Sequence, residues 1–233
     1  MKTTFKAFIT LITCTATVCA EEKAKLPIVC MGDSVTAGSG SDGLPYCKRI
    51  GGINAGIGGN TTVQGLERFR RDVLVHNPRT ITIGFGLNDP SNGIPLKEFR
   101  ANMLAMIKLA NPKRRKVVLL TPNPRPVEYL GETKEQLNAK LYPYVLEIRR
   151  IARRQKLQVV DVYAEFAELS FRDNLLSYFD DIIHPNAAGH DVIYRLFIRS
   201  GLVRDRGSVS AVATRDGTLP EKISQETTRR DLR

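Results

Sequence analysis

Short apolar runs alternate with amphipathic segments along the 233-residue chain, and this alternation constrains the fold more than any other feature. Five runs are short and rich in Val and Ile, as buried parallel strands are. They are Ile28–Met31, Gly52–Asn54, Arg79–Gly84, Val117–Thr121 and Leu157–Val162. Four segments have the apolar spacing of helices, namely Thr62–His76, Leu96–Ala110, Lys134–Gln155 and Ala187–Ser200. Strands separated by helices predict an α/β fold, in which helices cover both faces of a five-stranded parallel sheet.

The composition is that of a single globular domain, with 42% apolar and 25% charged residues. The formal net charge is +11. Many cations stand in runs, which we predict to be solvated faces: Arg68–Arg71, Lys113–Lys116 and Arg149–Lys156. Such a basic chain is suited to anionic cell-surface polymers or lipid headgroups. We predict no nucleic-acid partner, because no aromatic or recognition-helix pattern accompanies the charge.

The first 20 residues have the pattern of a secretory signal. Lys2 and Lys6 precede an apolar stretch, Phe8–Val18, and small residues stand before Ala20. The stretch is shorter than the roughly 20 residues that a membrane-spanning helix needs, so no stable span is expected. We predict that residues 1–20 are a signal peptide, and that cleavage near Ala20 yields an exported protein, periplasmic or secreted.

Signal cleavage would leave two cysteines, Cys30 and Cys47, in a predicted domain at residues 21–203. Cysteines of exported proteins often pair, but a buried strand cysteine, as Cys30 is predicted to be, can also pack as a free thiol. Both alternatives stay open. No C-x-x-C or His-rich spacing indicates zinc, so no metal is expected. Residues 204–233 are polar and poor in aromatics, and we predict a disordered tail.

Three predicted strands are each followed by small and polar residues. Gly32-Asp33-Ser34 follows the first strand, Asn54–Thr62 includes the end of the second, and Gly84–Asp89 follows the third. The carboxyl ends of parallel strands share one edge, where ligands of such sheets bind. We therefore expect these segments to meet there. Ser34 is a candidate nucleophile, although a serine in this place can also simply cap a helix.

A second candidate segment stands about 150 residues later, where Asp181 and His184 are three residues apart. With a serine, this pair supplies a nucleophile, a general base and a group that orients the base. The other two histidines, His76 and His190, fall in predicted helices and are expected to be structural. Asp180 is adjacent to Asp181 and competes for the orienting role.

In order, the chain reads G-D-S, N-A-G-I-G-G-N, G-L-N-D and D-x-x-H-P. This series of blocks resembles the SGNH (GDSL-type) hydrolase family over residues 28–200, in particular its small single-domain esterases and lysophospholipases. The resemblance implies a flavodoxin-like α/β/α sandwich and a serine esterase that works through an acyl-enzyme, without a cofactor. It implies a catalytic triad of Ser34, Asp181 and His184. It also implies an oxyanion hole from the backbone N–H groups of Ser34 and Gly59 and the side chain of Asn88.

The candidate substrates are small esters, lipids and acetylated glycans, and the oligomeric state stays open. The alternative function is a non-catalytic glycan-binding domain on the same scaffold, against which the complete set of site residues argues. The segment Gly38–Gly43 matches a dinucleotide fingerprint, but no helix opens at Gly43, so no such cofactor is expected. The stretch from Ser34 to Gly59 is short and rich in Gly and Ser, which leaves open whether a whole first helix forms.

Overall fold

The computed structural model describes residues 27–127 and 131–204. Their centre is a five-stranded parallel sheet with strand order β2-β1-β3-β4-β5. The strands are β1 (Ile28–Gly32), β2 (Gly52–Gly56), β3 (Thr80–Gly84), β4 (Lys116–Leu120) and β5 (Gln158–Val160). β2 pairs with one edge of β1, and β3 pairs with the opposite edge. The end of β1 is therefore the switch point, where open parallel sheets bind ligands.

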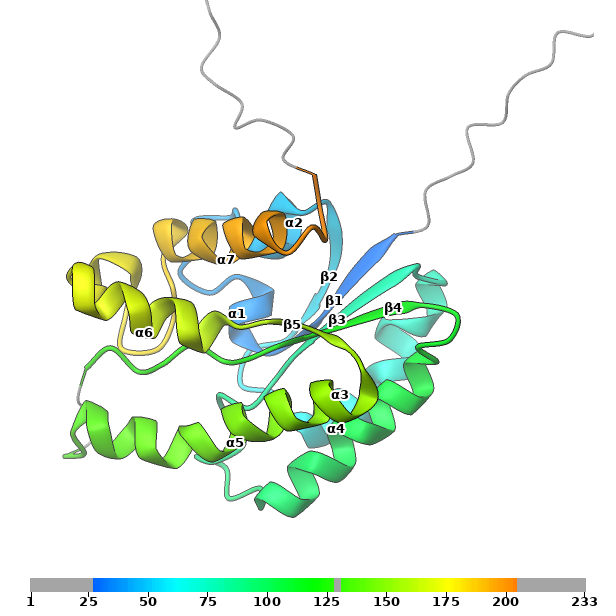
Figure 1. Ribbon diagram of the computed structural model, residues 1–233, viewed down its shortest axis with the longest axis horizontal. Helices are drawn as coiled ribbons and strands as arrows, with labels where there is room; N and C mark the ends of the chain where they lie inside the picture. Colours follow the sequence, from blue (N-terminus) through cyan, green and yellow to red (C-terminus); the bar gives the residue numbers. More distant parts are fainter. Residues whose placement is uncertain (1–26, 128–130, 205–233) are drawn as a thin grey trace, which may run out of the picture.

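Helices cover both faces of the sheet (Figure 1). One face is covered by α3 (Thr62–Asp72), α4 (Leu96–Ala110) and α5 (Lys134–Gln155). The other is covered by α2 (Tyr46–Arg49), α6 (Val162–Arg172) and α7 (Ala187–Arg199). Successive strand residues point to opposite faces, so Val29 joins the first core and Cys30 the second. The predicted α/β/α sandwich with a parallel five-stranded sheet is confirmed.

Glycines end the three strands nearest the switch point, and they explain how the chain turns there. Gly32 lies opposite both Gly56 and Gly84 in the register of the sheet. A Cβ on Gly32 would lie 2.6 Å from the Gly84 carbonyl oxygen and 2.1 Å from Thr36 Oγ1. Only glycine therefore lets the single-turn helix α1 (Ser34–Ala37) sit directly over the end of the sheet. This packing brings Ser34 to the carboxyl edge.

The first connection does not form one whole helix, which answers the question that the sequence left open. It consists of the four-residue helices α1 and α2, separated by a turn-rich segment. The predicted helices Leu96–Ala110 and Lys134–Gln155 have the observed bounds. The predicted helix Thr62–His76 is α3 followed by a separate 3-10 turn, η1 (Leu74–His76).

The predicted strand Leu157–Val162 extends too far, because Asp161 caps a helix that the sequence analysis missed. The carboxylate of Asp161 accepts a hydrogen bond from the Ala164 N–H at 3.2 Å, and α6 starts at Val162. A 3-10 turn, η2 (Leu175–Tyr178), then leads towards Asp181 and His184.

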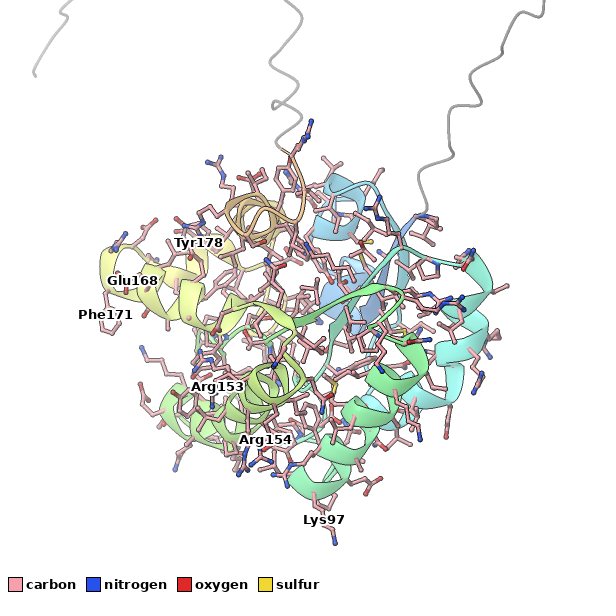
Figure 2. The ribbon with its side chains drawn as sticks, turned by 45° about the vertical axis from the view of Figure 1, so that its right-hand side comes forward. Lys97, Arg153, Arg154, Glu168, Phe171 and Tyr178 are labelled. Atoms are coloured by element: carbon pink, nitrogen blue, oxygen red, sulfur yellow. The ribbon has the colours of Figure 1, made fainter. Side chains whose placement is uncertain are left out.

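Most cations of two of the three runs are solvated as predicted, whereas Arg115 and Arg149 are half-buried. Lys113, Lys116, Arg153 and Arg154 are exposed, and Figure 2 shows Arg153 and Arg154 on the outer side of α5. Cys30 and Cys47 are both buried free thiols, so they do not form a disulfide in the structure. Among the described helices, none combines the length and apolarity of a membrane span. The predicted signal peptide and residues 205–233 of the predicted tail lie outside the described residues.

Candidate active site

Ser34 is the first residue of α1, two residues beyond the end of β1. Asp33 caps this helix, and its Oδ1 accepts a hydrogen bond from the Val35 N–H at 3.0 Å. A residue at the start of a helix has no intrahelical acceptor for its N–H, so the Ser34 amide is free of the helical hydrogen-bond pattern. Its Oγ lies 2.9 Å from His184 Nε2, although the two residues are 150 positions apart.

His184 stands between Ser34 and Asp181. Its Nδ1 lies 2.7 Å from Asp181 Oδ2. The other carboxylate oxygen, Oδ1, accepts hydrogen bonds from the N–H groups of Ile183 and His184, each at 2.6 Å. Partial burial opposes ionisation, but the hydrogen bonds from His184 and Ile183 outweigh that cost and lower the pKa of the Asp181 carboxyl. An ionised Asp181 favours the imidazole tautomer that keeps its proton on Nδ1.

The loop that carries this pair is closed by an antiparallel bridge between Phe179 and Pro185. Inside the bridge, the N–H of Asp180 donates to the His184 carbonyl oxygen at 2.9 Å. Asp180 thus reaches His184 through its backbone, and it is exposed to solvent. The carboxylate that meets the imidazole is that of Asp181, in the place that the three-residue spacing indicates.

The segment after β2 passes close to Ser34. The N–H of Ile57 donates to the Gly32 carbonyl oxygen at 3.1 Å. A Cβ on Gly58 would lie 4.0 Å from that of Ser34. Gly59 has φ +73°, a conformation that favours glycine, and the space around its Cβ position is open. The amide of Gly59 therefore belongs to a turn at the rim of the Ser34 site.

Of the two residues that follow β3, Asn88 is bonded to this same turn and Asp89 to the start of α3. The Asn88 side chain donates to the Asn60 carbonyl oxygen at 3.1 Å. The buried Asp89 accepts hydrogen bonds from the N–H and hydroxyl of Thr62, at the start of α3. Burial raises the pKa of the Asp89 carboxyl. The structure thus brings five residues to one edge: Ser34, Gly59, Asn88, Asp181 and His184.

One residue of this region, Arg68, was not predicted from the sequence to belong to the site, but to a solvated face. This assignment is wrong, because the Arg68 side chain is only 5% exposed. Its Nε donates to Asn60 Oδ1 at 2.7 Å and its Nη2 to the Gly32 carbonyl oxygen at 2.8 Å. The signal was present in the helical spacing, since Arg68 stands three residues after Gly65 and six after Thr62, which are buried on the same side of α3.

Asp33 is an unusual neighbour for Ser34, because its side chain is buried. Burial, with a smaller contribution from the charge of Asp89, raises the pKa of Asp33 to about 7. In the unfolded chain an Asp carboxyl has a pKa of about 3.9. Between these values the folded protein binds more protons than the unfolded one, so Asp33 lowers stability as the pH rises towards 7.

The substitution Asp33→Asn should remove this pH dependence. Asparagine keeps the oxygen that caps Val35 and never ionises. At each pH we compare the unfolding free energy of the variant with that of the wild type. We expect this difference to favour the variant by about 2–3 kcal/mol more at pH 8 than at pH 5. Urea denaturation at the two pH values measures this difference, and Asp42→Asn, at an exposed aspartate, is the control. An equal difference at both pH values would contradict the prediction.

The remaining histidines lie elsewhere. His190 is buried, and its Nδ1 accepts a hydrogen bond from the Tyr46 N–H at 3.2 Å. Burial lowers the pKa of His190 to about 4, so it is neutral at pH 7 and packs between α7 and α2. His76 is exposed in η1. Within residues 27–127 and 131–204, no group of three or more His, Cys, Asp or Glu side chains is arranged to hold a metal ion.

Comparison with known proteins identifies the family. The model of the GDSL-like lipase/acylhydrolase family matches residues 30–192. The chain belongs to this family. An acetylxylan esterase of Geobacillus stearothermophilus is 25% identical over 158 residues, which are 63% of this chain and 70% of the relative. A lipoprotein of Bacillus subtilis is 33% identical over 114 residues, 40% of this chain and 47% of the relative.

Solved structures agree with this assignment. A GDSL-like lipase from Bacteroides thetaiotaomicron superimposes with a TM-score of 0.64 and 25% identity, over 76% of this chain and 87% of the other. The resemblance to SGNH hydrolases that the four sequence blocks indicate is therefore confirmed. This member of the family is a serine hydrolase that acts on ester bonds.

Proposed function

We propose that this GDSL-family protein hydrolyses carboxylic acyl or acetyl esters through an acyl-enzyme on Ser34. The observation that carries the proposal is the continuous chain of contacts from Ser34 Oγ through His184 to Asp181, at 2.9 and 2.7 Å. With the proton on Nδ1 held by Asp181, the free Nε2 of His184 accepts the Ser34 proton as Oγ attacks the ester carbonyl. His184 then gives the proton to the leaving alcohol, and water, activated in the same way, releases the acid.

The negative oxygen that forms during attack needs hydrogen-bond donors aimed at it. The N–H of Ser34, the N–H of Gly59 and the side chain of Asn88 are the donors in this proposal. Their support is that the turn holding Gly59 passes beside Ser34, and that Asn88 is bonded to the same turn. The non-catalytic glycan-binding alternative is not favoured, since it requires no such alignment of a serine, a histidine and a carboxylate.

Hydrolysis of a nitrophenyl acetate by the wild type and by Asn88→Ala tests the proposal. Loss of one oxyanion donor typically lowers kcat by about 10²–10³, with a smaller change in KM. The control is Asn92→Ala, which removes an exposed amide that donates to the Asn88 carbonyl oxygen at 2.9 Å. If the wild type released neither nitrophenol from nitrophenyl esters of several acyl lengths nor acetate from acetylated glycans, the proposed function would be overturned. Full kcat in a folded Asn88→Ala variant would show that Asn88 is not an oxyanion donor.

We also infer that the protein is exported. The support is the charged start, the apolar stretch and the small residues before Ala20, together with the similarity to the Bacillus subtilis lipoprotein. N-terminal sequencing of the protein from an expressing bacterium tests this inference. We expect the protein outside the cytoplasm, with a first residue at or near Glu21. Protein that stays in the cytoplasm with Met1 intact would contradict export.

A further inference from the structure

Arg68 is the one buried arginine that reaches the rim of the proposed active site from α3, among the residues that the structure describes. Its guanidinium joins the ends of two strands and the turn between β2 and α3. Nη2 donates to the Gly32 carbonyl oxygen at 2.8 Å, Nη1 to the Ala55 carbonyl oxygen at 2.7 Å, and Nε to Asn60 Oδ1 at 2.7 Å. One rigid planar group therefore fixes three chain segments relative to one another.

Two of these segments carry the proposed oxyanion donors. Gly32 stands two residues before Ser34, and Asn60 directly follows Gly59. Asn60 is held from both sides, because its carbonyl oxygen accepts from the Asn88 side chain and its side chain accepts from Arg68. The positions of all three proposed donors thus depend on contacts that converge on Arg68 and Asn60.

The charge of Arg68 needs a counterion at this buried place, because an unpaired buried charge is strongly unfavourable. Asp72, one turn later on α3, supplies it at 3.1 Å from Nη1. Asp72 also pairs with Arg71, whose side chain is 75% exposed, at 2.7 Å. Arg68 and Arg71 therefore share one carboxylate, but only Arg68 reaches the strand ends and Asn60. This difference offers a matched pair of variants.

From these contacts we infer that Arg68 is a positioning residue, which sets the separation of the oxyanion donors without touching the substrate. This inference rests on the proposed function. A lysine at this position keeps the charge, but its single ammonium cannot span the three acceptors that the planar guanidinium reaches. A merely structural arginine would affect stability alone. A positioning residue also affects the chemical step, since misplacement of reacting groups by about 1 Å costs on the order of 100-fold in rate.

Steady-state kinetics of Arg68→Lys and Asn60→Ala, with the rate of fluorophosphonate labelling, test the inference. We expect kcat and the labelling rate to fall by about 10–100-fold in both variants while KM changes by less than about threefold. Their effects should be less than additive in the double variant, because both remove the same contact. Arg71→Gln, which removes the exposed partner of Asp72, should keep kcat close to that of the wild type.

The measurements can contradict the proposed function and the role of Arg68 separately. An inactive wild type would contradict the proposed function. An active wild type whose Asn60→Ala variant is folded and keeps full kcat would overturn the role of Arg68, even where Arg68→Lys fails to fold. Loss of kcat in Arg71→Gln equal to that in Arg68→Lys would also overturn it, because the shared Asp72 would then be the cause.

Discussion

The substitution Ser34→Ala is expected to abolish covalent labelling by a fluorophosphonate and to lower kcat for an ester by about 10⁶, as loss of a serine nucleophile does in other triads. The physical reason is that Ser34 Oγ is the atom 2.9 Å from His184 Nε2, so its hydroxyl has a base to accept its proton. Alanine removes the attacking oxygen and leaves the helix cap on Asp33 intact. Mass spectrometry of the labelled protein and initial rates measure the two losses.

Ser41→Ala is the matched control for this prediction. Ser41 is a buried serine in the same connection, and its hydroxyl has no hydrogen-bond partner in the structure. The control should keep both labelling and kcat. A folded Ser34→Ala protein that is still labelled at the wild-type rate would show that another residue is the nucleophile.

The elements that the sequence predicts well are those whose signals are local. α4 and α5 have the predicted bounds because their apolar spacing is long and regular, and because Asn111 and Pro112 follow the first of them. α6 was missed because Val159 and Val160 run on into Val162, so that one apolar stretch hides the boundary between a strand and a helix. The boundary depends on Asp161, whose carboxylate caps α6 and pairs with Arg149 at 2.7 Å. That ion pair joins the start of α6 to α5, and the apolar pattern does not show it.

In the candidate site too, the residues with local sequence signals were predicted, and one residue that depends on contacts across the fold was not. The spacing of Asp181 and His184, and the placing of Ser34 and Asn88 after strands, are visible in the sequence because topology gathers strand ends at one edge. Arg68 was assigned to the surface because charge usually indicates exposure. Besides Asp72, its partners are two backbone carbonyl oxygens and the side chain of Asn60, and contacts with backbone carbonyl oxygens cannot be read from a sequence. The helical spacing indicated the buried side of α3 for Arg68, but only the fold shows which strand ends it contacts.

The substitution Asp181→Asn should lower kcat by about 10⁴, as the corresponding change does in other serine triads, while Asp180→Asn should have little effect. Asparagine at 181 keeps the Oδ1 that accepts from Ile183 and His184, so the loop should hold its shape. In place of Oδ2, asparagine puts an amide NH₂ group beside His184 Nδ1, which in the wild type meets that carboxylate oxygen at 2.7 Å. The imidazole must then turn to its other tautomer, and Nε2 can no longer accept the Ser34 proton.

Two measurements separate an effect on the base from a general loss of structure. Urea denaturation should find Asp181→Asn folded, since the contacts of Oδ1 with the N–H groups of Ile183 and His184 remain. Asp180→Asn should keep the wild-type kcat, because Asp180 meets His184 through its backbone N–H. A larger loss of kcat in Asp180→Asn than in Asp181→Asn would transfer the orienting role to Asp180. Full kcat in a folded Asp181→Asn variant would mean that its carboxylate does not act on the base.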